Sequence, residues 1–101
     1  MSIVKIKIQE EVLEWAKQRD LLKEENAPKQ LLKLQEEVGE LAGAFLKKKP
    51  KEICDAIGDI QVVLIILAQQ LNIDYNACLV YAYDEIKDRT GKTVDGSFIK
   101  D

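Results

Sequence analysis

The stretch that decides the fold is residues 50–71, which reads PKEICDAIGDIQVVLIILAQQL. Its first half spaces carboxylates at helical intervals, and its second half, residues 62–68, is apolar on every side of a helix. A helix of that kind has to be covered on all sides, which four short helices cannot do alone. The stretch therefore predicts a central helix in an all-α domain that assembles with further copies of itself.

Three other segments have apolar residues at helical spacing. They predict helices over about residues 8–22, 29–47 and 75–89, with Asn26 and Asp74 as N-caps of the last two. The second helix is expected to bury six apolar side chains: Leu31, Leu34, Val38, Leu41, Ala42 and Phe45. Residues 91–101 are polar with two glycines, so we expect a flexible tail on a single domain spanning residues 1–101.

Composition excludes several classes of function. The chain has 101 residues, a net charge of −3, no histidine and two cysteines. Histidine-based acid, base and nucleophile relays are excluded, and the negative charge argues against a nucleic-acid partner. Cys54 and Cys78 lie in apolar stretches and are expected to be buried. The N-terminus lacks a signal-peptide pattern and residues 62–68 are too few to span a bilayer, so we expect a cytoplasmic protein with no membrane partner.

The second predicted helix carries one cluster of carboxylates. Glu36, Glu37 and Glu40 fall on one arc of its helical wheel, with Glu37 nearest the apolar edge. Like charges one turn apart repel slightly, by about 0.2–0.5 kcal/mol per pair. Taken alone, such a cluster is more typical of a solvated face than of a site.

The third predicted helix carries a second cluster. Glu52, Asp55 and Asp59 share an arc that continues into the apolar residues 62–68, so Asp59 is expected at the edge of the interior. A carboxylate there has to be neutralised by a proton, a basic partner or a metal ion, and a buried salt bridge stays open as an explanation. Helices joined by a tight turn pack antiparallel, which would place the two clusters opposite each other. Oxygen ligands alone favour Mg²⁺, Mn²⁺ or Ca²⁺.

Residues 33–41, KLQEEVGEL, followed by residues 55–60, DAIGDI, resemble the MazG nucleotide pyrophosphohydrolase family. The likeness extends from residue 12 to residue 89. It implies a four-helix MazG-like bundle that forms a homo-oligomer, either a dimer or a tetramer. It also implies Mg²⁺-dependent hydrolysis of (deoxy)nucleoside triphosphates to monophosphate and pyrophosphate, with Mn²⁺ as a second usable ion.

The resemblance also implies roles for individual residues. Glu37, Glu40 and Asp59 match metal-ligand positions, and Glu36 matches a position that orients or deprotonates the attacking water. Substrate contacts are expected from Lys33, Lys87, Arg89 and Trp15. For Trp15 a place in the core is the competing interpretation, and for the basic run at residues 47–49 a solvated surface is favoured over attraction of the triphosphate.

One departure from the family pattern concerns residue 56. The second half of the motif usually has a glutamate there, whereas this chain has Ala56. Asp55 is expected to supply the missing carboxylate, with Glu52 as the second choice. The departure keeps a different class of function open: a catalytically impaired helical protein whose third helix serves oligomerisation or interaction.

Overall fold

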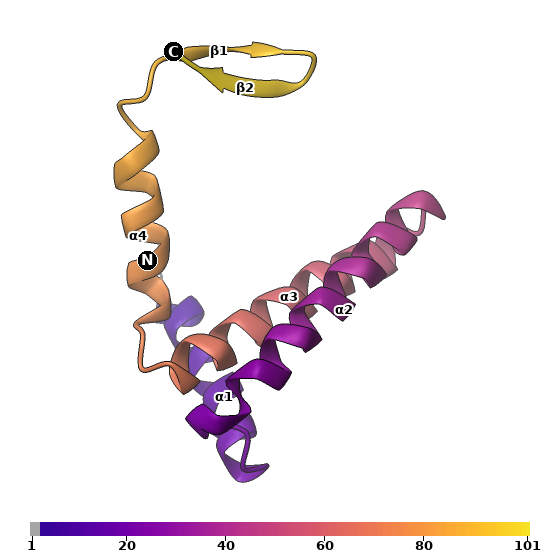
Figure 1. Ribbon diagram of the computed structural model, residues 1–101. Helices are drawn as coiled ribbons and strands as arrows, with labels where there is room; N and C mark the ends of the chain where they lie inside the picture. Colours follow the sequence, from indigo (N-terminus) through magenta and orange to yellow (C-terminus); the bar gives the residue numbers. More distant parts are fainter. Residues whose placement is uncertain (1–2) are drawn as a thin grey trace.

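The chain folds into four helices and one β-hairpin. The computed structural model describes residues 3–101, with side chains from residue 7 onward, so residues 1 and 2 of the predicted domain lie outside it. The elements are α1 (Ile3–Gln18), the short 3₁₀ helix η1 (Glu24–Asn26), α2 (Ala27–Leu46), α3 (Pro50–Gln70), α4 (Tyr75–Ile86), β1 (Gly91–Val94) and β2 (Ser97–Lys100) (Figure 1). The predicted all-α class with four helices is confirmed.

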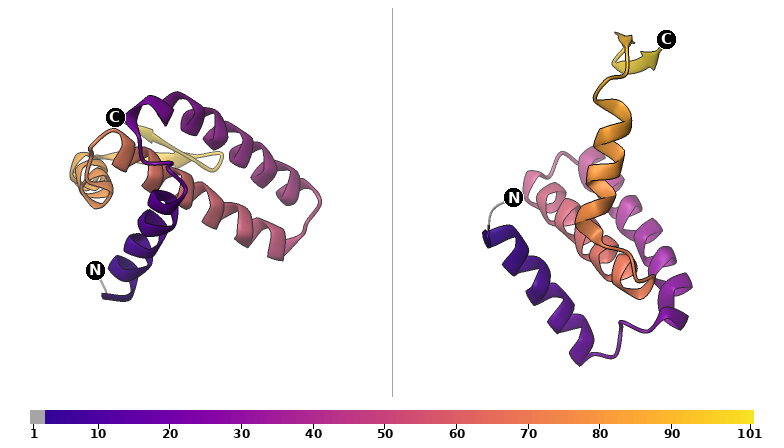
Figure 2. Two further views of the ribbon diagram at one scale, coloured as in Figure 1. Left: turned by 90° about the horizontal axis from the view of Figure 1, so that it is seen from below. Right: turned by 90° about the vertical axis from the view of Figure 1, so that its left-hand side faces the viewer.

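Helices α2 and α3 form an antiparallel pair joined by a short turn, as the sequence predicted (Figure 1). Helix α1 packs across the C-terminal part of α3 (Figure 2). The buried apolar side chains come mainly from α3 and are joined by alanines of the other helices: Ala16, Ala27, Ala44, Ala56, Val63, Ile65, Ile66 and Ala68. Small side chains let helices approach closely, so this arrangement fixes how the two carboxylate clusters face each other.

The helix ends agree with most of the predicted signals. Asp74 is the N-cap of α4, and its side chain accepts hydrogen bonds from the backbone N–H of Asn76 at 3.0 Å and of Ala77 at 3.3 Å. Asn26 is at the N-cap position of α2, as predicted, but its side chain makes no capping hydrogen bond. Its amide nitrogen donates to the carbonyl oxygen of Asp20 at 3.4 Å. Helix α1 begins at Ile3, upstream of the predicted start.

Several side chains predicted to be buried are exposed. On α2, Leu31, Val38 and Phe45 are 49–68% exposed and Ala42 is also exposed, since no element of the described chain covers that side of the helix. Leu34 and Leu41 are half-buried. Cys54 and Cys78 are free thiols on exposed surfaces, so their predicted burial is wrong for the single chain. Within residues 62–68, four side chains are buried and three half-buried.

Helix α4 and the hairpin extend away from the other helices (Figures 1 and 2). The first turn of α4 is held by Asn76, which exchanges two amide hydrogen bonds with Gln9 of α1 at 2.9 and 3.1 Å. No single described helix is long and apolar enough to cross a membrane; α3 and α4 reach that length and composition only jointly, across a bend of 104°.

An antiparallel hairpin stands where the sequence predicted a flexible tail. Its strands pair Lys92 with Ile99 and Thr93 with Phe98. Asp95 (φ 50°) and Gly96 (φ 82°) form a two-residue turn with two positive φ angles, which an Asp-Gly pair favours. Gly91 is required by close packing, because a Cβ atom there would overlap the backbone oxygen of Ile99 on the paired strand. Local pairing therefore orders a segment whose composition is typical of a loop.

Candidate metal site

Carboxylates of α2 and α3 meet where the two helices face each other. Glu37 and Glu40 of α2 and Asp59 of α3 each place one carboxylate oxygen within 4.8 Å of the other two. Glu37 and Glu40 are one turn apart on their helix, and the antiparallel pairing brings Asp59 opposite them. The structure thus brings together the three residues that the sequence predicted as principal metal ligands.

Glu37 is the most buried of the three carboxylates. Its side chain is 7% exposed, and its Oε1 lies 3.3 Å from the ammonium group of Lys33. Its Oε2 has no hydrogen-bond partner among the residues that the structure describes. A buried carboxylate oxygen without a partner is costly, which points to a ligand absent from the protein itself.

The three carboxylates repel one another electrostatically. The negative charge of Glu37 raises the pKa of Glu40 above its ordinary value. Burial is the main cause that raises the pKa of Asp59, and the negative charges of Asp55 and Glu37 add to it. Among the side chains of residues 7–101, the only ion pair to any of the three is that of Lys33 with Glu37. The buried salt bridge considered for Asp59 is therefore not found among these described side chains.

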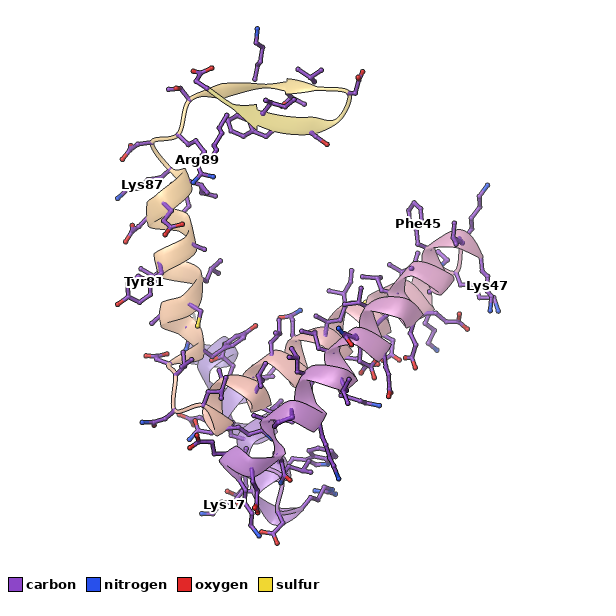
Figure 3. The ribbon with its side chains drawn as sticks, in the orientation of Figure 1. Lys17, Phe45, Lys47, Tyr81, Lys87 and Arg89 are labelled. Atoms are coloured by element: carbon purple, nitrogen blue, oxygen red, sulfur yellow. The ribbon has the colours of Figure 1, made fainter. Side chains whose placement is uncertain are left out.

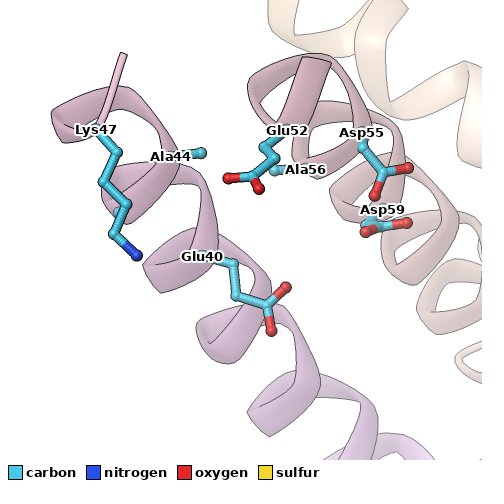
Figure 4. A pocket seen from close by; sticks show the side chains of 8 residues that line it. Glu40, Ala44, Lys47, Glu52, Asp55, Ala56 and Asp59 are labelled. Carbon is cyan, nitrogen blue, oxygen red and sulfur yellow. The ribbon is translucent and has the colours of Figure 1, made fainter. Parts of the chain in front are cut away.

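A cavity of about 320 Å³ adjoins this group (Figure 4). It lies between α2 and α3 and is lined by Glu40, Gly43, Ala44, Lys47, Glu52, Asp55, Ala56 and Asp59. Asp55 lies beside Asp59, and the Glu52 carboxylate points toward α2 (Figure 4). Both predicted additional ligands therefore line the cavity, although neither belongs to the group of three.

Lys47 lines the cavity, although the sequence favoured a solvated surface for this residue. The basic run at residues 47–49 looked like a solvated helix end, yet the structure places Lys47 in the wall of the cavity. The available signal was geometric: Lys47 follows Glu40 by seven residues, or about two helical turns, and so lies on the same face of α2. It offers a cation in a cavity otherwise dominated by carboxylates.

Other predicted site residues lie apart from the three carboxylates. The Glu36 side chain is 65% exposed and pairs with Lys33 at 3.6 Å. Trp15 is half-exposed on α1, with the guanidinium of Arg19 4.2 Å from its ring centroid. Lys87 and Arg89 lie at the far end of α4 (Figure 3), where Lys87 pairs with Asp84 at 3.3 Å. A single chain does not bring these last two residues to the cavity.

Comparison with known proteins identifies the family. Residues 4–90 match the family model described as phosphoribosyl-ATP pyrophosphohydrolase. The chain belongs to this family, which is part of the MazG-like nucleoside triphosphate pyrophosphatase superfamily, so the predicted resemblance is confirmed at that level. The description of the family model names a pyrophosphohydrolase. The family is of a metal-dependent type, and the acidic group has donors suited to a metal ion.

A curated relative comes from Haemophilus phage HP1 (strain HP1c1). It is described as "Uncharacterized 18.2 kDa protein in rep-hol intergenic region" and is 48% identical over 61 residues. The match covers 60% of this chain and 37% of the relative, so it spans little more than a third of that protein's length. No solved structure matches the chain.

Proposed function

We propose that the protein is a Mg²⁺-dependent nucleoside triphosphate pyrophosphohydrolase that converts (d)NTP to (d)NMP and pyrophosphate. The observation that carries this proposal is the buried Oε2 of Glu37, which has no hydrogen-bond partner among the described side chains and lies in a group with Glu40 and Asp59. The family description also supports phosphoribosyl-ATP as a second candidate substrate. Hydrolysis of either compound would break the same bond, between the α- and β-phosphates.

The donor set fits a divalent cation. Glu37, Glu40 and Asp59 offer hard carboxylate oxygens, and no thiol or imidazole is among the groups that gather there. Mg²⁺ suits such donors, since it binds a few carboxylates and keeps several waters, and Mn²⁺ accepts the same ligands. We propose Asp55 as a further ligand because it lies beside Asp59 in the cavity wall, with Glu52 as the second choice.

Several residues of the chain would have separate roles in the reaction. When bound, the cation would neutralise triphosphate charge and polarise the α-phosphoryl group. Glu36 would orient a water and accept its proton while the water oxygen attacks the α-phosphorus and pyrophosphate departs. Lys33, within salt-bridge distance of both Glu36 and Glu37, would hold these neighbouring carboxylates in position.

Substrate contacts are proposed from Lys33, Lys87, Arg89 and Trp15. The Trp15 ring is half-exposed under a guanidinium group, a geometry that leaves part of an aromatic surface open for stacking. The proposed assembly is a homodimer or homotetramer, supported by the exposed apolar side of α2. The net charge of −3 supports free nucleotides rather than nucleic acid as the partner, and a cytoplasmic location stays a prediction from the sequence.

A catalytically impaired interaction protein is the alternative. Ala56 favours it, because this cavity-lining position carries a methyl group where the superfamily motif usually has a carboxylate. Under this alternative the metal ion would still bind weakly, and the exposed apolar side chains would provide the function.

The deciding experiment incubates the protein with Mg²⁺ and a panel of NTPs, dNTPs and phosphoribosyl-ATP, then separates the products by chromatography. Monophosphate plus pyrophosphate supports the proposal, whereas diphosphate plus phosphate contradicts it. Glu40→Gln is expected to abolish turnover, and Glu25→Gln, an exposed substitution on η1, serves as the matched control. Absence of turnover with every compound favours the interaction protein.

A further inference from the structure

Lys47 is a basic side chain in the wall of an acidic cavity. The residues that line the cavity carry four carboxylates and one ammonium group, that of Lys47. The neighbouring Lys49 lies 3.8 Å from the carboxylate of Glu52, whereas Lys47 forms no ion pair among the side chains of residues 7–101. Its positive charge is therefore available to a ligand that enters the cavity.

The ammonium group of Lys47 faces the same space as the carboxylates. Lys47 follows Glu40 by seven residues on α2, which is about 10 Å along a helix axis. Helical side chains tilt toward the N-terminus of their helix, and the Lys47 side chain extends along α2 in the direction of Glu40 (Figure 4). The cavity thus has carboxylates of the metal group at one level and a cation farther along the same helix.

Small residues border the space between these two levels. Gly43 and Ala44 of α2 and Ala56 of α3 line the cavity there. A Cβ atom at Gly43 would meet no heavy atom within 4 Å outside its chain neighbours and its own helix backbone. The space beside α2 is therefore open, and a chain of phosphate groups can extend from Glu40 toward Lys47.

The direction of the reaction gives Lys47 a role, which rests on the proposed function. Glu36, the residue proposed to orient the water, lies about one helical turn before Glu40 on α2. In-line displacement places the attacking and leaving oxygens on opposite sides of the phosphorus, and the cavity continues on the side away from Glu36. We propose that Lys47 binds the pyrophosphate moiety of the substrate and stabilises the negative charge that this group gains as it leaves.

The chemistry of the step fits a lysine at this place. The water oxygen forms a bond to the α-phosphorus, and Glu36 accepts a proton from the water. The bond from the α-phosphorus to the oxygen that bridges it to the β-phosphorus breaks, and pyrophosphate leaves with that electron pair. An ammonium group is a compact point charge with three N–H donors, which suits phosphate oxygens. Pyrophosphate leaves from either candidate substrate, so the role of Lys47 does not depend on the nucleoside.

A purely structural role for Lys47 predicts different results. Lys47 is the C-cap of α2, where a positive charge also interacts favourably with the helix dipole. If Lys47 had only this role, its replacement would lower the Tm and leave the affinity for pyrophosphate unchanged. Binding therefore has to be measured separately from stability.

The first test measures binding without turnover. Calorimetry follows the titration of pyrophosphate into the folded protein at saturating Mg²⁺. Lys47→Gln is expected to weaken the affinity about 10–100-fold, the loss expected for a hydrogen bond to a charged group, and Lys47→Arg should retain most of it. Lys51→Gln is the matched control, because it removes the same charge from an exposed residue of α3 that does not line the cavity. Equal affinity in Lys47→Gln and the wild type, or no binding of pyrophosphate by the wild type, would overturn the inference.

The second test measures steady-state kinetics. In Lys47→Gln, kcat/KM is expected to fall about 10–100-fold, and inhibition by the product pyrophosphate should weaken, while inhibition by the monophosphate stays unchanged. An equal loss of inhibition by both products would indicate a general effect of charge and would overturn the assignment of Lys47 to pyrophosphate.

The two tests separate failure of this inference from failure of the proposed function. Pyrophosphate binding that depends on Lys47, with no turnover of any nucleotide, would retain Lys47 as a pyrophosphate-binding residue and refute the enzyme. Wild-type turnover with unchanged kcat/KM in Lys47→Gln would retain the enzyme and refute the role of Lys47, provided circular dichroism shows that the variants are folded.

Discussion

Replacement of Glu37 by glutamine should remove most of the stabilisation that Mg²⁺ gives to the protein. The side chain is almost fully buried, with Oε1 beside Lys33 and Oε2 without a partner among the described residues. Glutamine has the same shape but no charge, so it leaves no cavity and removes repulsion with Glu40 and Asp59. The substitution therefore separates the electrostatics of the site from its packing.

The expected change in the free energy of unfolding follows from two terms. In the absence of metal the variant loses an ion pair to a half-exposed lysine, worth about 0–1 kcal/mol. It also replaces an unpartnered buried carboxylate oxygen, whose burial costs about 1–3 kcal/mol, with an amide N–H group that can donate to the neighbouring carboxylate of Glu40 or Asp59. The metal-free variant should thus be at least as stable as the wild type. With Mg²⁺ at about ten times its Kd the wild type gains about 1.4 kcal/mol, or roughly 6–11 °C in Tm, and the variant gains little.

Thermal melts followed by circular dichroism, with chelator and then with saturating Mg²⁺, measure both terms. Glu36→Gln is the matched control, since Glu36 shares the Lys33 pair but is largely exposed and outside the group of three. It should retain the Mg²⁺-induced rise in Tm even if activity is lost. A wild-type Mg²⁺ response in Glu37→Gln would refute the assignment of Glu37 as a ligand.

Three further predictions concern the pH dependence of the site and the roles of Asp55 and Ala56. The pKa values of Glu40 and Asp59 are raised in the metal-free fold, so the contribution of these two groups to stability is present at low pH and is lost as the pH rises through their folded-state pKa values. The Mg²⁺-induced rise in Tm should grow over the same pH range, because the ion binds the deprotonated carboxylates. Equal Tm shifts at about pH 5 and about pH 8 would contradict this. Asp55→Asn should weaken Mg²⁺ binding about 10–100-fold in calorimetry if Asp55 is a ligand, and unchanged affinity would exclude it. Ala56→Glu should lower Tm without metal, because it buries a charge, and raise Mg²⁺ affinity; a lower affinity would show that the carboxylate cannot reach the ion.

Much of the carboxylate arrangement could be predicted because helix geometry is local. The helical wheel placed Glu37 nearest the apolar edge of its cluster, although a solvated face was favoured for the cluster, and Glu37 is buried. The short turn before Pro50 predicted that α2 and α3 are antiparallel. Asp59 was expected where its carboxylate arc meets the apolar segment, and burial there raises its pKa. These features depend on residues within two neighbouring helices.

The rest depends on partners that periodicity cannot identify. An amphipathic pattern indicates that Leu31, Val38 and Phe45 favour a covering surface, but it does not identify which part of this chain or of a partner covers them. The hairpin was missed because strands of four residues carry little signal, although Asp95-Gly96 is a common hairpin turn. Arg89 lies far from the Lys47 end of α2 in the single chain (Figure 3), and helix periodicity carries no information on whether a second copy brings the two together.

Ala56 links the site to the packing of the helices. It is buried and, with Ala44 of α2, lines the cavity between the two helices. A glutamate at position 56 would place its side chain in that space. Alanine therefore lacks this carboxylate and leaves open volume beside the carboxylates of Glu37, Glu40 and Asp59. Asp55, beside Asp59 on the cavity wall (Figure 4), can return a negative charge without filling that space. The substitution is therefore compatible with catalysis on a differently shaped substrate, and comparing Ala56→Glu with Asp55→Asn on the same nucleotide panel distinguishes a reshaped site from an impaired one.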